Sequence, residues 1–392
     1  MEKIVFTEEF CQPESLFPFT LTRQVQDIRV GILTIREKWE TALELPSFDK
    51  FEDDYKDLDK AIVLEEEIGE DVVYLIHGNI LPTPKLVKQV RKLKHGDFIS
   101  VPQRESVVYC ISKKEVLNEH RIKVGKPVEV EEELKEIQCP WHIFEMNGWA
   151  IEQDFGLLTR KRKSHGLSGT NKVINEDHIF VEKGAQVEHC FLNASDGPIY
   201  IGKNAVVMEG SMLRGPVAIC EGAVVKMGAR LYGATTIGPK CVVGGEIKNC
   251  VFFGRSNKAH DGYLGDSVIG EWCNMGAGTS NSNIKNNASP VQVWTPRGAI
   301  NVGQKCGVFM GDYTRTAINT AINTGTVMGV CSNVFGNGLT PKYIPHFSWG
   351  CEGIERYEFD KALSDISNWK SLKKEAVTEN ERIILKHIFD HY

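Results

Sequence analysis

The chain has 392 residues, of which 42% are hydrophobic and 25% are charged, so its composition excludes a wholly disordered protein and is typical of a globular one. Its formal net charge is −6, which argues against a broadly basic surface that would bind nucleic acid without sequence preference. No apolar run reaches the roughly 18 residues of a membrane-spanning helix, so we expect no nucleic-acid partner and no membrane segment.

The eleven cysteines are scattered, and the closest two are Cys241 and Cys250. This spacing provides no CxxC pair for structural zinc or for redox chemistry. In the opening segment MEKIVFTEEF, acidic residues interrupt the apolar stretch that a signal peptide needs. We therefore expect buried free thiols in a protein of the reducing cytoplasm.

Residues 1–175 are predicted to form one α/β domain, because strand-like runs alternate there with helical spacing. The expected strands are 3–6, 71–78, 96–101 and 105–112, and the expected helix is 82–93, which opens with prolines. The acidic segment VEVEEELKEI (128–137) is predicted to be a solvated helix or a loop.

Residues 176–350 contain a repeat of six residues. From Ile201 an aliphatic residue returns at every sixth position as far as Val243, as Ile201, Val207, Leu213, Ile219, Val225, Leu231, Ile237 and Val243. The phase resumes at Ile269 and Met275, and again as Met310, Thr316, Ile322, Met328 and Val334. A period of six fits one flat side of a triangular coil with its aliphatic residue inside, which predicts a hexapeptide-repeat parallel β-helix rather than a β-sandwich.

The phase breaks twice, at residues 249–262 and at about 281–308, and both segments are expected to leave the coil as loops. The last part of the chain, residues 351–392, changes to charged segments with helical spacing. We expect this helical tail to pack on the end of the solenoid or on a neighbouring subunit.

The segment KAHDGYLGDSVIGEWCNMGAGTSNSN (258–283) is the most specific motif in the chain. Together with Arg230 and the EIK of residues 246–248, it resembles the acetyltransferase half of the bifunctional glucosamine-1-phosphate N-acetyltransferase/N-acetylglucosamine-1-phosphate uridylyltransferase family. The resemblance covers residues 180–340 and includes long fixed gaps. It implies a left-handed β-helix, acetyl-coenzyme A as co-substrate, and a homotrimer whose sites are shared between neighbours.

The resemblance also implies roles for individual residues. His260 would be the general base that takes a proton from the attacking sugar amine, and Asn283 would orient it. Arg230 and Lys248 match the cations that hold the sugar phosphate. Without the resemblance, a single loop histidine such as His260 is more often an ordinary surface residue.

Two further positions match residues that bind the phosphosugar, Tyr263 and Asn274. Asn274 could equally be a rung of an asparagine ladder within the coil. Ala277, between Gly276 and Gly278, would leave room for acetyl-coenzyme A close to the backbone. The chain departs from the family at NIKN (283–286) and lacks the lysine that usually follows, so either Lys285 replaces that lysine or the acceptor differs.

In the amino-terminal half, LFPFTLTRQVQDIRVGILTIREKWE (16–40) resembles the opening of nucleoside-diphosphate-sugar pyrophosphorylases. The glycine-rich phosphate loop of those enzymes is replaced here by FTEEFCQPES (6–15), which has no glycine. The remaining candidates for binding UTP or dTTP are Arg23, Arg29 and Lys38. Asn79 and Asn147 match positions that hold Mg²⁺ in that family, although an amide is a poorer ligand than a carboxylate.

Together these features predict a cytoplasmic sugar-1-phosphate enzyme with a Rossmann-like nucleotidyltransferase domain, a left-handed β-helix acyltransferase domain and a helical tail. Its expected reaction is acetyl transfer from acetyl-coenzyme A to an amino-sugar 1-phosphate such as glucosamine 1-phosphate. Nucleotidyl transfer from UTP or dTTP would follow if the amino-terminal half is active. The alternatives are a nucleotidyltransferase without acetyl transfer, and a solenoid that binds phosphosugar without catalysis.

Overall fold

The computed structural model describes residues 2–8, 11–48, 72–101, 107–112, 116–117, 121–122 and 125–392. Its contacts divide the chain into two compact units. The amino-terminal unit comprises residues 1–16, 23–28 and 33–138, and the solenoid unit comprises residues 17–22, 29–32 and 139–392. None of the helices in the described ranges is long and apolar enough to cross a membrane.

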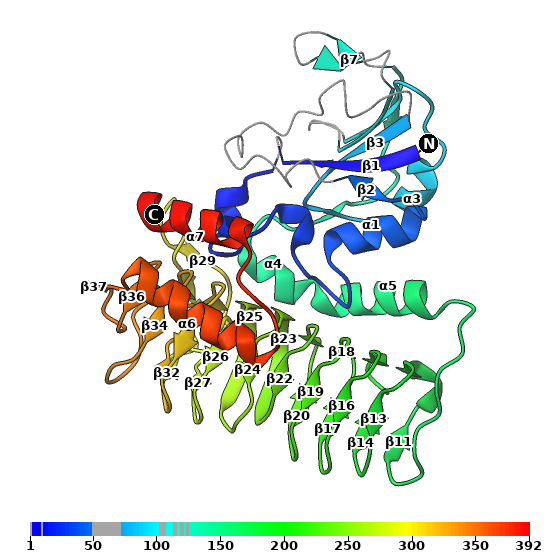
Figure 1. Ribbon diagram of the computed structural model, residues 1–392. Helices are drawn as coiled ribbons and strands as arrows, with labels where there is room; N and C mark the ends of the chain where they lie inside the picture. The colour runs from blue at the N-terminus through cyan, green and yellow to red at the C-terminus, as the bar shows by residue number, and fades with distance from the viewer. Residues whose placement is uncertain are drawn as a thin grey trace. The chain divides into compact units, whose positions relative to one another are not determined.

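The amino-terminal unit is built around a mixed sheet with the strand order β2-β1-β3-β6-β5-β9 (Figure 1). Its strands are β1 (Glu2–Thr7), β2 (Ser47–Phe48), β3 (Val72–His77), β5 (Phe98–Ser100), β6 (Val108–Ser112) and β9 (Pro127–Glu129). Strand β1 is parallel to both of its neighbours, whereas β6 is antiparallel to β3 and β5. Two short pairs lie outside this sheet, β4 (Ile80–Leu81) with β10 (Lys135–Glu136) and β7 (Val116–Leu117) with β8 (Arg121–Ile122).

Two helices complete this unit, α1 (Ile35–Leu43) and α3 (Pro84–Val90), together with the 3-10 turns Pro13–Leu16 and Val25–Asp27. Helix α1 begins at a capping box in which Thr34 and Glu37 each accept from the backbone N–H of the other. Trp39 of this helix is fully buried, and its indole N–H donates to the carbonyl of Ile80 at 2.8 Å. Helix α3 has Pro84 in its first turn, where a missing N–H is harmless.

The predicted strands at 3–6, 71–78, 96–101 and 105–112 are confirmed as β1, β3, β5 and β6, and the helix at 82–93 as α3. Residue 71 of the second strand and residues 105–106 of the last strand lie outside the described residues. The helix alternative for residues 128–137 is wrong, because this segment holds the end of β9 and all of β10, whereas the loop alternative holds for residues 130–134 between the two strands. The alternation of valine and glutamate at residues 128–131 has the period of two of a strand, and β9 lies at the edge of the sheet.

The solenoid unit is a parallel β-helix whose coils present three flat faces, here called A, B and C. Face A is formed by β11 (Lys172–Ile174), β14 (Phe191–Asn193), β17 (Met212–Arg214), β20 (Arg230–Tyr232) and the first residues of β23 (Glu246–Gly254) and β25 (Tyr263–Glu271). The pair β27 (Ser280–Asn281) and β32 (Ala321–Ile322) forms a separate two-stranded sheet in the later coils.

Face B contains β12 (Ile179–Val181), β15 (Ile199–Ile201), β18 (Val217–Ile219), β21 (Thr235–Ile237), the last residues of β23 and β25, then β30 (Phe309–Met310), β33 (Val327–Met328) and β35 (Tyr343–Ile344). Face C contains β13 (Gln186–Val187), β16 (Val206–Val207), β19 (Val224–Val225), β22 (Val242–Val243), β24 (Asn257–Lys258), β26 (Asn274–Met275), β31 (Arg315–Thr316), β34 (Asn333–Val334) and β36 (Ser348–Trp349), and it ends with β37 (Glu355–Arg356), which is antiparallel. A 3-10 turn at Glu176–His178 precedes β12.

The inward positions of the coils are the aliphatic residues of the six-residue repeat. All eight residues from Ile201 to Val243 in that series are at most 2% exposed and belong to one continuous core. The later series is buried as well, with Met310, Met328 and Val334 at 0%. The predicted β-solenoid is therefore confirmed, while its left-handed sense rests on the family resemblance.

The two phase breaks have opposite causes. Val225 pairs with Val243 eighteen residues on, but Val243 pairs with Lys258 only fifteen residues on, so this turn is shorter than the others. The expected loop at 249–262 is therefore wrong, because β23 continues around the corner from face A to face B as one strand. The loop at 281–308 is confirmed. It contains the antiparallel pair β28 (Gln292–Val293) and β29 (Ile300–Asn301), and the coil resumes at β30, where Met310 pairs with Ile269 of β25.

The carboxyl-terminal tail forms helices α6 (Phe359–Leu372) and α7 (Glu379–His391), which pack on the solenoid (Figure 1). Their buried side chains join those of the coil corners in one apolar cluster, which includes Trp272, Tyr313, Phe347, Ile366, Leu385 and Ile388. The Tyr313 hydroxyl donates to Glu381 at 2.8 Å, and Arg255 pairs with Glu375 at 3.0 Å. The tail therefore packs along the coil corners of its own solenoid rather than only on its end, and packing on a neighbouring subunit stays a prediction.

Helices α4 (Pro140–Glu145) and α5 (Asn147–Thr159) also belong to the solenoid unit, together with the 3-10 turn Phe19–Leu21. They contact strands of face B, and the ring of Phe144 stacks on that of Phe309 with centroids 6.2 Å apart. The domain limits predicted at residues 175 and 350 stay predictions.

Candidate functional site

Face A brings three of the predicted phosphosugar residues onto neighbouring strands. Arg230 of β20, Glu246 of β23 and Tyr263 of β25 lie opposite one another in register, and Lys248 lies opposite Tyr232. The Arg230 side chain is 51% exposed, and its guanidinium is 3.5 Å from the Glu246 carboxylate. A cation on each of two adjacent strands is an arrangement that can hold a phosphate.

Glu246 stands in the EIK motif without a predicted role and Tyr232 belongs to no motif, yet both lie beside the predicted cations. The Tyr232 hydroxyl donates to Glu246 at 2.6 Å, and the Lys248 ammonium lies 5.7 Å from the centroid of the Tyr232 ring. The hydrogen bond to Glu246 raises the pKa of Tyr232 to about 12. The phenol is therefore neutral at physiological pH and donates its proton to the Glu246 carboxylate, which lies beside Arg230. The EIK motif already contained Glu246, whereas only the alternation of outward residues along β20 could have indicated Tyr232.

Tyr263, Asn283 and Asp266 form a polar cluster at the edge of this face. The Asn283 amide donates to the Tyr263 hydroxyl oxygen at 3.1 Å and to one Asp266 carboxylate oxygen at 2.5 Å. Asn249 donates to the other oxygen of Asp266 at 2.7 Å, and Asp266 is only 5% exposed. Burial raises the pKa of Tyr263, and the negative charge of Asp266 adds to the effect. The phenol keeps its proton and can donate it to a ligand.

Gly265 is needed for this cluster to form. A Cβ built there would lie 2.3 Å from the Tyr263 hydroxyl oxygen and 2.9 Å from the Asn283 amide nitrogen. Contacts under 3.0 Å force a neighbour to move, so any side chain at Gly265 would displace Tyr263 or Asn283.

His260 occupies the corner between β24 of face C and β25 of face A, and it is exposed. Its backbone carbonyl accepts a hydrogen bond from the Lys258 ammonium at 2.7 Å. The hydrogen bonds described for the Asn283 side chain lead to Tyr263 and Asp266 rather than to the His260 ring. The orienting role of Asn283 thus stays a prediction, as does the base role of His260.

Asn274 lies on face C, not on face A. It stands in register between Asn257 and Arg315, and its side-chain oxygen accepts from the Asn257 amide at 3.5 Å. Lys373, just beyond helix α6, donates to Asn257 at 3.2 Å. Within one chain, therefore, Asn274 is a member of a polar ladder and is separated by a corner of the coil from Arg230 and Tyr263.

The glycines that flank Ala277 are explained by the stacking of coils. A Cβ at Gly276 would lie 2.4 Å from the backbone of Ala317, and one at Gly278 would lie 2.1 Å from the Asn319 side-chain oxygen. Gly278 also has a positive φ of +74°. The carbonyl of Ala277 accepts from the backbone N–H of Asn319 at 2.7 Å. These contacts account for the glycines without a ligand, and the cofactor role of Ala277 stays a prediction.

Two candidates from the amino-terminal half lie in the solenoid unit, and both are deeply buried. Arg29 is 7% exposed, and its guanidinium donates to the carbonyl of Phe253 at 3.1 Å and to that of Ile32. Asn147, at the start of α5, is fully buried. Its oxygen accepts from the N–H of Gly31 at 2.7 Å and from the Thr236 hydroxyl at 3.1 Å.

The Asn147 amide also donates to the carbonyl of Ala234 at 2.6 Å, so both its polar atoms are used within the fold. Asp154 of α5 accepts from the N–H of Ile32 at 2.8 Å. Gly31 has a φ of +78°, and a Cβ there would lie 2.6 Å from the Asp154 carboxylate. Segment 29–32 is therefore fastened to α5 and to face B by Arg29 and Asn147.

The other three candidates lie in the amino-terminal unit. Asn79 follows β3 and is 7% exposed, and its side-chain oxygen accepts from the Cys11 thiol at 3.3 Å. Lys38 of α1 is 3% exposed, and Arg23 is half-buried. Over the described ranges, no group of three or more His, Cys, Asp or Glu side chains is placed to hold a metal ion. The roles proposed for these residues in binding nucleotide and Mg²⁺ stay predictions.

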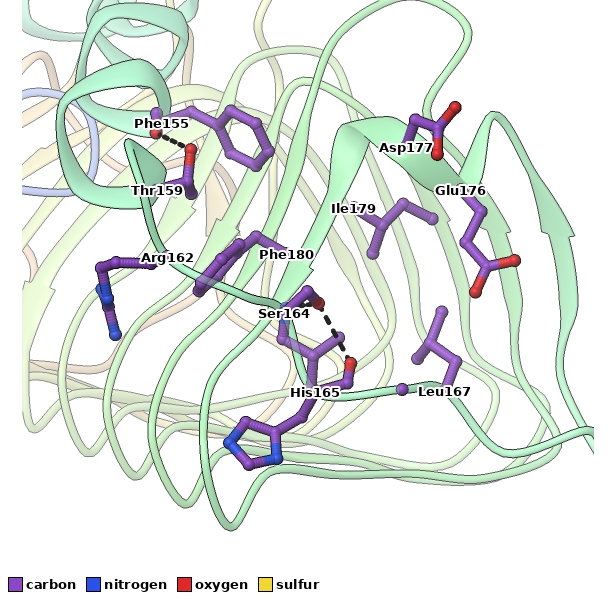
Figure 2. Close-up of a pocket in the computed structure, with 12 residues that line it drawn as sticks. Phe155, Thr159, Arg162, Ser164, His165, Leu167, Glu176, Asp177, Ile179 and Phe180 are labelled. Carbon is purple, nitrogen blue, oxygen red and sulfur yellow. Dashed lines mark hydrogen bonds between the residues drawn. The ribbon is translucent and has the colours of Figure 1, made fainter.

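A cavity of about 410 Å³ lies at the first coils, between the end of α5 and β12 (Figure 2). Its lining includes Phe155, Leu167, Ile179 and Phe180, with the acidic Glu176 and Asp177 also in the lining. Arg162 stands over the ring of Phe180 and pairs with Glu182 at 2.6 Å. None of the predicted site residues lines this cavity.

Comparison with known proteins supports the resemblance seen in the sequence. Residues 4–163 match the family model described as sugar nucleotidyl transferase. The chain is 30% identical to a bifunctional sugar-1-phosphate nucleotidylyltransferase/acetyltransferase of Sulfurisphaera tokodaii over 242 residues, which are 61% of this chain and 53% of that protein. It is 33% identical to the bifunctional protein GlmU of Methanocaldococcus jannaschii over 84 residues, which are 21% of each chain.

An acetyltransferase of Escherichia coli, YaiX, is 36% identical over 151 residues, which are 38% of this chain and 66% of that protein. Among solved structures, the polySia specific acetyltransferase NeuO matches 52% of this chain and 93% of its own with 13% identity and a TM-score of 0.27, too low to support an argument. The chain spans about half the length of the Sulfurisphaera relative and less of the Methanocaldococcus one.

Proposed function

We propose that this protein transfers the acetyl group of acetyl-coenzyme A to the amine of an amino-sugar 1-phosphate, with glucosamine 1-phosphate as the acceptor. One observation carries the proposal. Arg230, Lys248 and Tyr263 lie on adjacent strands of face A, and the exposed His260 lies at the corner where β25 begins. The relatives named as acetyltransferases agree with this class of reaction.

In this reaction the amine nitrogen attacks the thioester carbonyl carbon and the carbon–sulfur bond breaks. His260 takes the proton that the amine loses, and the proton then passes to the leaving thiolate, so that free coenzyme A is released. An imidazole suits this task because it exchanges protons at neutral pH. Arg230 and Lys248 hold the sugar phosphate, and Tyr263, whose proton is retained, donates to the acceptor.

We place the complete site between two copies of the chain in a homotrimer. Asn274 and the acceptor residues of face A lie on different faces, so they meet only if neighbouring subunits share a site. Phe191 and Met212 precede Arg230 in the same register row of face A, and each is 51% exposed. A flat sheet with apolar side chains beside the candidate site is a surface that a second copy would cover.

A second activity, nucleotidyl transfer from UTP or dTTP to the sugar phosphate, is favoured by the family match of residues 4–163. Arg23, Lys38 and Asn79 would serve it in the amino-terminal unit, with Mg²⁺ as the expected ion. The reducing cytoplasm is the proposed location, because all eleven cysteines are free thiols and most are buried.

The test is the release of coenzyme A by the wild-type protein with three acceptors. Glucosamine 1-phosphate should support release, N-acetylglucosamine 1-phosphate should not because its amine is blocked, and glucosamine without phosphate should be used poorly because Arg230 and Lys248 lose their partner. Equal release with and without glucosamine 1-phosphate would contradict the proposal.

A further inference from the structure

One inward position of the solenoid is occupied by a lysine. Along face C the inward column runs Val207, Val225, Val243 and then Lys258, and each residue pairs with the next in register. Lys258 is only 2% exposed, and Val243 beside it belongs to the apolar core. In the following coil the equivalent position holds Met275, which fills the column without a charge.

The Lys258 ammonium is directed at the corner that carries His260. Its nitrogen donates to the carbonyl of His260 at 2.7 Å and to that of Gly244 at 3.2 Å. On the other side, a Cβ at Gly245, whose φ is +72°, would lie 2.9 Å from the same His260 carbonyl. The His260 carbonyl therefore fits between the buried ammonium and a residue that must be glycine.

The rest of this corner is equally constrained. Gly262 has a φ of +126°, and a Cβ there would lie 2.1 Å from the carbonyl of Thr279 in the next coil. One residue, Ala259, separates Lys258 from His260. The Lys258 ammonium holds the carbonyl of His260, and the close packing of Gly262 fixes the chain that follows. Lys258 therefore largely determines the direction in which the His260 side chain points from the coil.

We propose that Lys258 is a positioning residue for acetyl transfer, which holds the backbone of His260 so that the imidazole is presented at the edge of face A. The inference rests on the proposed function, because it assumes that His260 is the base. Lys258 itself does not touch the substrate, since its side chain is enclosed in the coil.

The protonation of Lys258 makes this role testable. Burial lowers the pKa of Lys258 to about 8, and the negative charge of Asp261 partly offsets the effect. The other titratable group facing it is the Cys250 thiol, which stays neutral because burial raises its pKa. On face C the neighbours in the column, Val243 and Met275, are uncharged. As pH rises through about 8, the bond to His260 changes from a charge-assisted one to a weaker, neutral one.

The experiment compares Lys258→Met, Lys258→Arg and the wild type in steady-state acetyl transfer from acetyl-coenzyme A to glucosamine 1-phosphate, between about pH 6 and pH 10. Lys203→Met, which removes a lysine that is 61% exposed on an earlier coil, is the matched control. The substrate amine titrates identically in every variant, so a difference between profiles reports on the protein.

In the wild type, kcat should fall as pH rises above about 8. In Lys258→Met, kcat should be lowered about tenfold or more at neutral pH, the KM for glucosamine 1-phosphate should change little, and the alkaline decline should disappear. Lys258→Arg keeps a permanent charge, so it should recover part of kcat and also lack the decline. An unchanged kcat in Lys258→Met, or an alkaline decline at the wild-type position in that variant, would overturn the proposal.

A stability measurement keeps the inference testable if Lys258→Met folds poorly. Because the pKa of Lys258 is lower in the folded protein than in the unfolded chain, the unfolded chain binds more protons between about pH 8 and about pH 10.4. The free energy of unfolding of the wild type should therefore rise relative to that of Lys258→Arg across this window. If the two free energies changed with pH in the same way, Lys258 would not be a buried amine that titrates near pH 8. If His260→Ala abolishes turnover while Lys258→Met keeps the kcat of the wild type, only this inference fails. If His260→Ala is fully active, the proposed function fails.

Discussion

Face A and segment 29–32 carry candidates of the same chemical types, yet they use their polar atoms in opposite ways. Arg230 is 51% exposed and has one carboxylate at 3.5 Å, whereas Arg29 is 7% exposed and donates to two backbone carbonyls. Asn283 donates to Tyr263 and Asp266 at the edge of face A. Asn147, in contrast, forms hydrogen bonds with backbone groups and with Thr236 through both its oxygen and its amide.

The comparison shows that a matching residue type is not sufficient evidence for a ligand-binding role. A guanidinium that is buried against carbonyls has its donors committed to the fold, and removing it leaves those carbonyls without partners. A guanidinium on an open sheet is available to a phosphate. We therefore expect substitutions on segment 29–32 and α5 to change stability, and substitutions on face A to change kinetics.

The largest effect on stability is expected at Asn147. Asn147→Ala leaves the N–H of Gly31, the Thr236 hydroxyl and the carbonyl of Ala234 without their partner. Because each unsatisfied buried group costs about 1–3 kcal/mol, the free energy of unfolding should fall by about 3–4 kcal/mol. Denaturant titration would measure it, with Asn286→Ala, at an exposed position of the loop at 281–308, as a control. A loss below about 1 kcal/mol would show that Asn147 is not structural.

Arg29 should have the next largest effect. Arg29→Met removes the donors to Phe253 and Ile32 and should lower the free energy of unfolding by about 2–3 kcal/mol. Binding of UTP or dTTP with Mg²⁺ to the folded variant, measured by calorimetry, should equal that of the wild type. A selective loss of nucleotide binding of about 1–3 kcal/mol with unchanged stability would instead assign Arg29 to the phosphates.

On face A the kinetic effect should be of intermediate size. Arg230→Ala and Lys248→Ala should each raise the KM for glucosamine 1-phosphate about 10–30-fold, the scale of one charge-assisted contact. The KM for acetyl-coenzyme A should stay the same, and stability should change little because the side chains lie at the surface. Arg214→Ala, which removes an exposed arginine of the same face paired with Asp196, is the control. If Arg214→Ala and Arg230→Ala raised the KM for glucosamine 1-phosphate equally, Arg230 would be no different from an ordinary surface arginine of face A.

The smallest expected effect concerns assembly. Met212→Glu puts a charge into the exposed apolar row of face A and should weaken association about tenfold. Sedimentation velocity across a concentration series would show this as a shift toward monomer, with turnover falling in parallel if the site is shared. Exposed Lys203→Glu, on a coil corner, should have no such effect. A wild-type protein that is monomeric at micromolar concentration would exclude the shared site.

The sequence was informative where structure follows from local repetition. The six-residue step placed Ile201, Leu213 and Val243 in the core, because an inward position recurs whenever the coil turns regularly. A break in the six-residue repeat did not reveal whether that turn of the coil is longer or shorter than the others. The turn that ends at Lys258 is shorter than the others, and β23 continues around its corner without a loop.

The burial of the other candidates depends on contacts between residues that are distant in the chain. Arg29 meets Phe253, and Asn147 meets both Gly31 and Thr236, so no local pattern indicates that these side chains are enclosed. The same holds for Asp266, whose role became visible only when Asn249 and Asn283 were seen on its two oxygens. The tertiary contacts show which residues of the motif at 258–283 hydrogen-bond to one another, and the roles that the resemblance gives these residues stay predictions.

The most direct test of the account is the turnover of His260→Ala with glucosamine 1-phosphate and acetyl-coenzyme A, beside His178→Ala as an exposed control histidine of the first coils. If the corner of face A is the acetyl-transfer site, kcat should fall about 10²–10⁴-fold in His260→Ala, the KM for acetyl-coenzyme A should change little, and the control should behave as the wild type. A kcat within about threefold of the wild type in His260→Ala would contradict the placement of the reaction on face A.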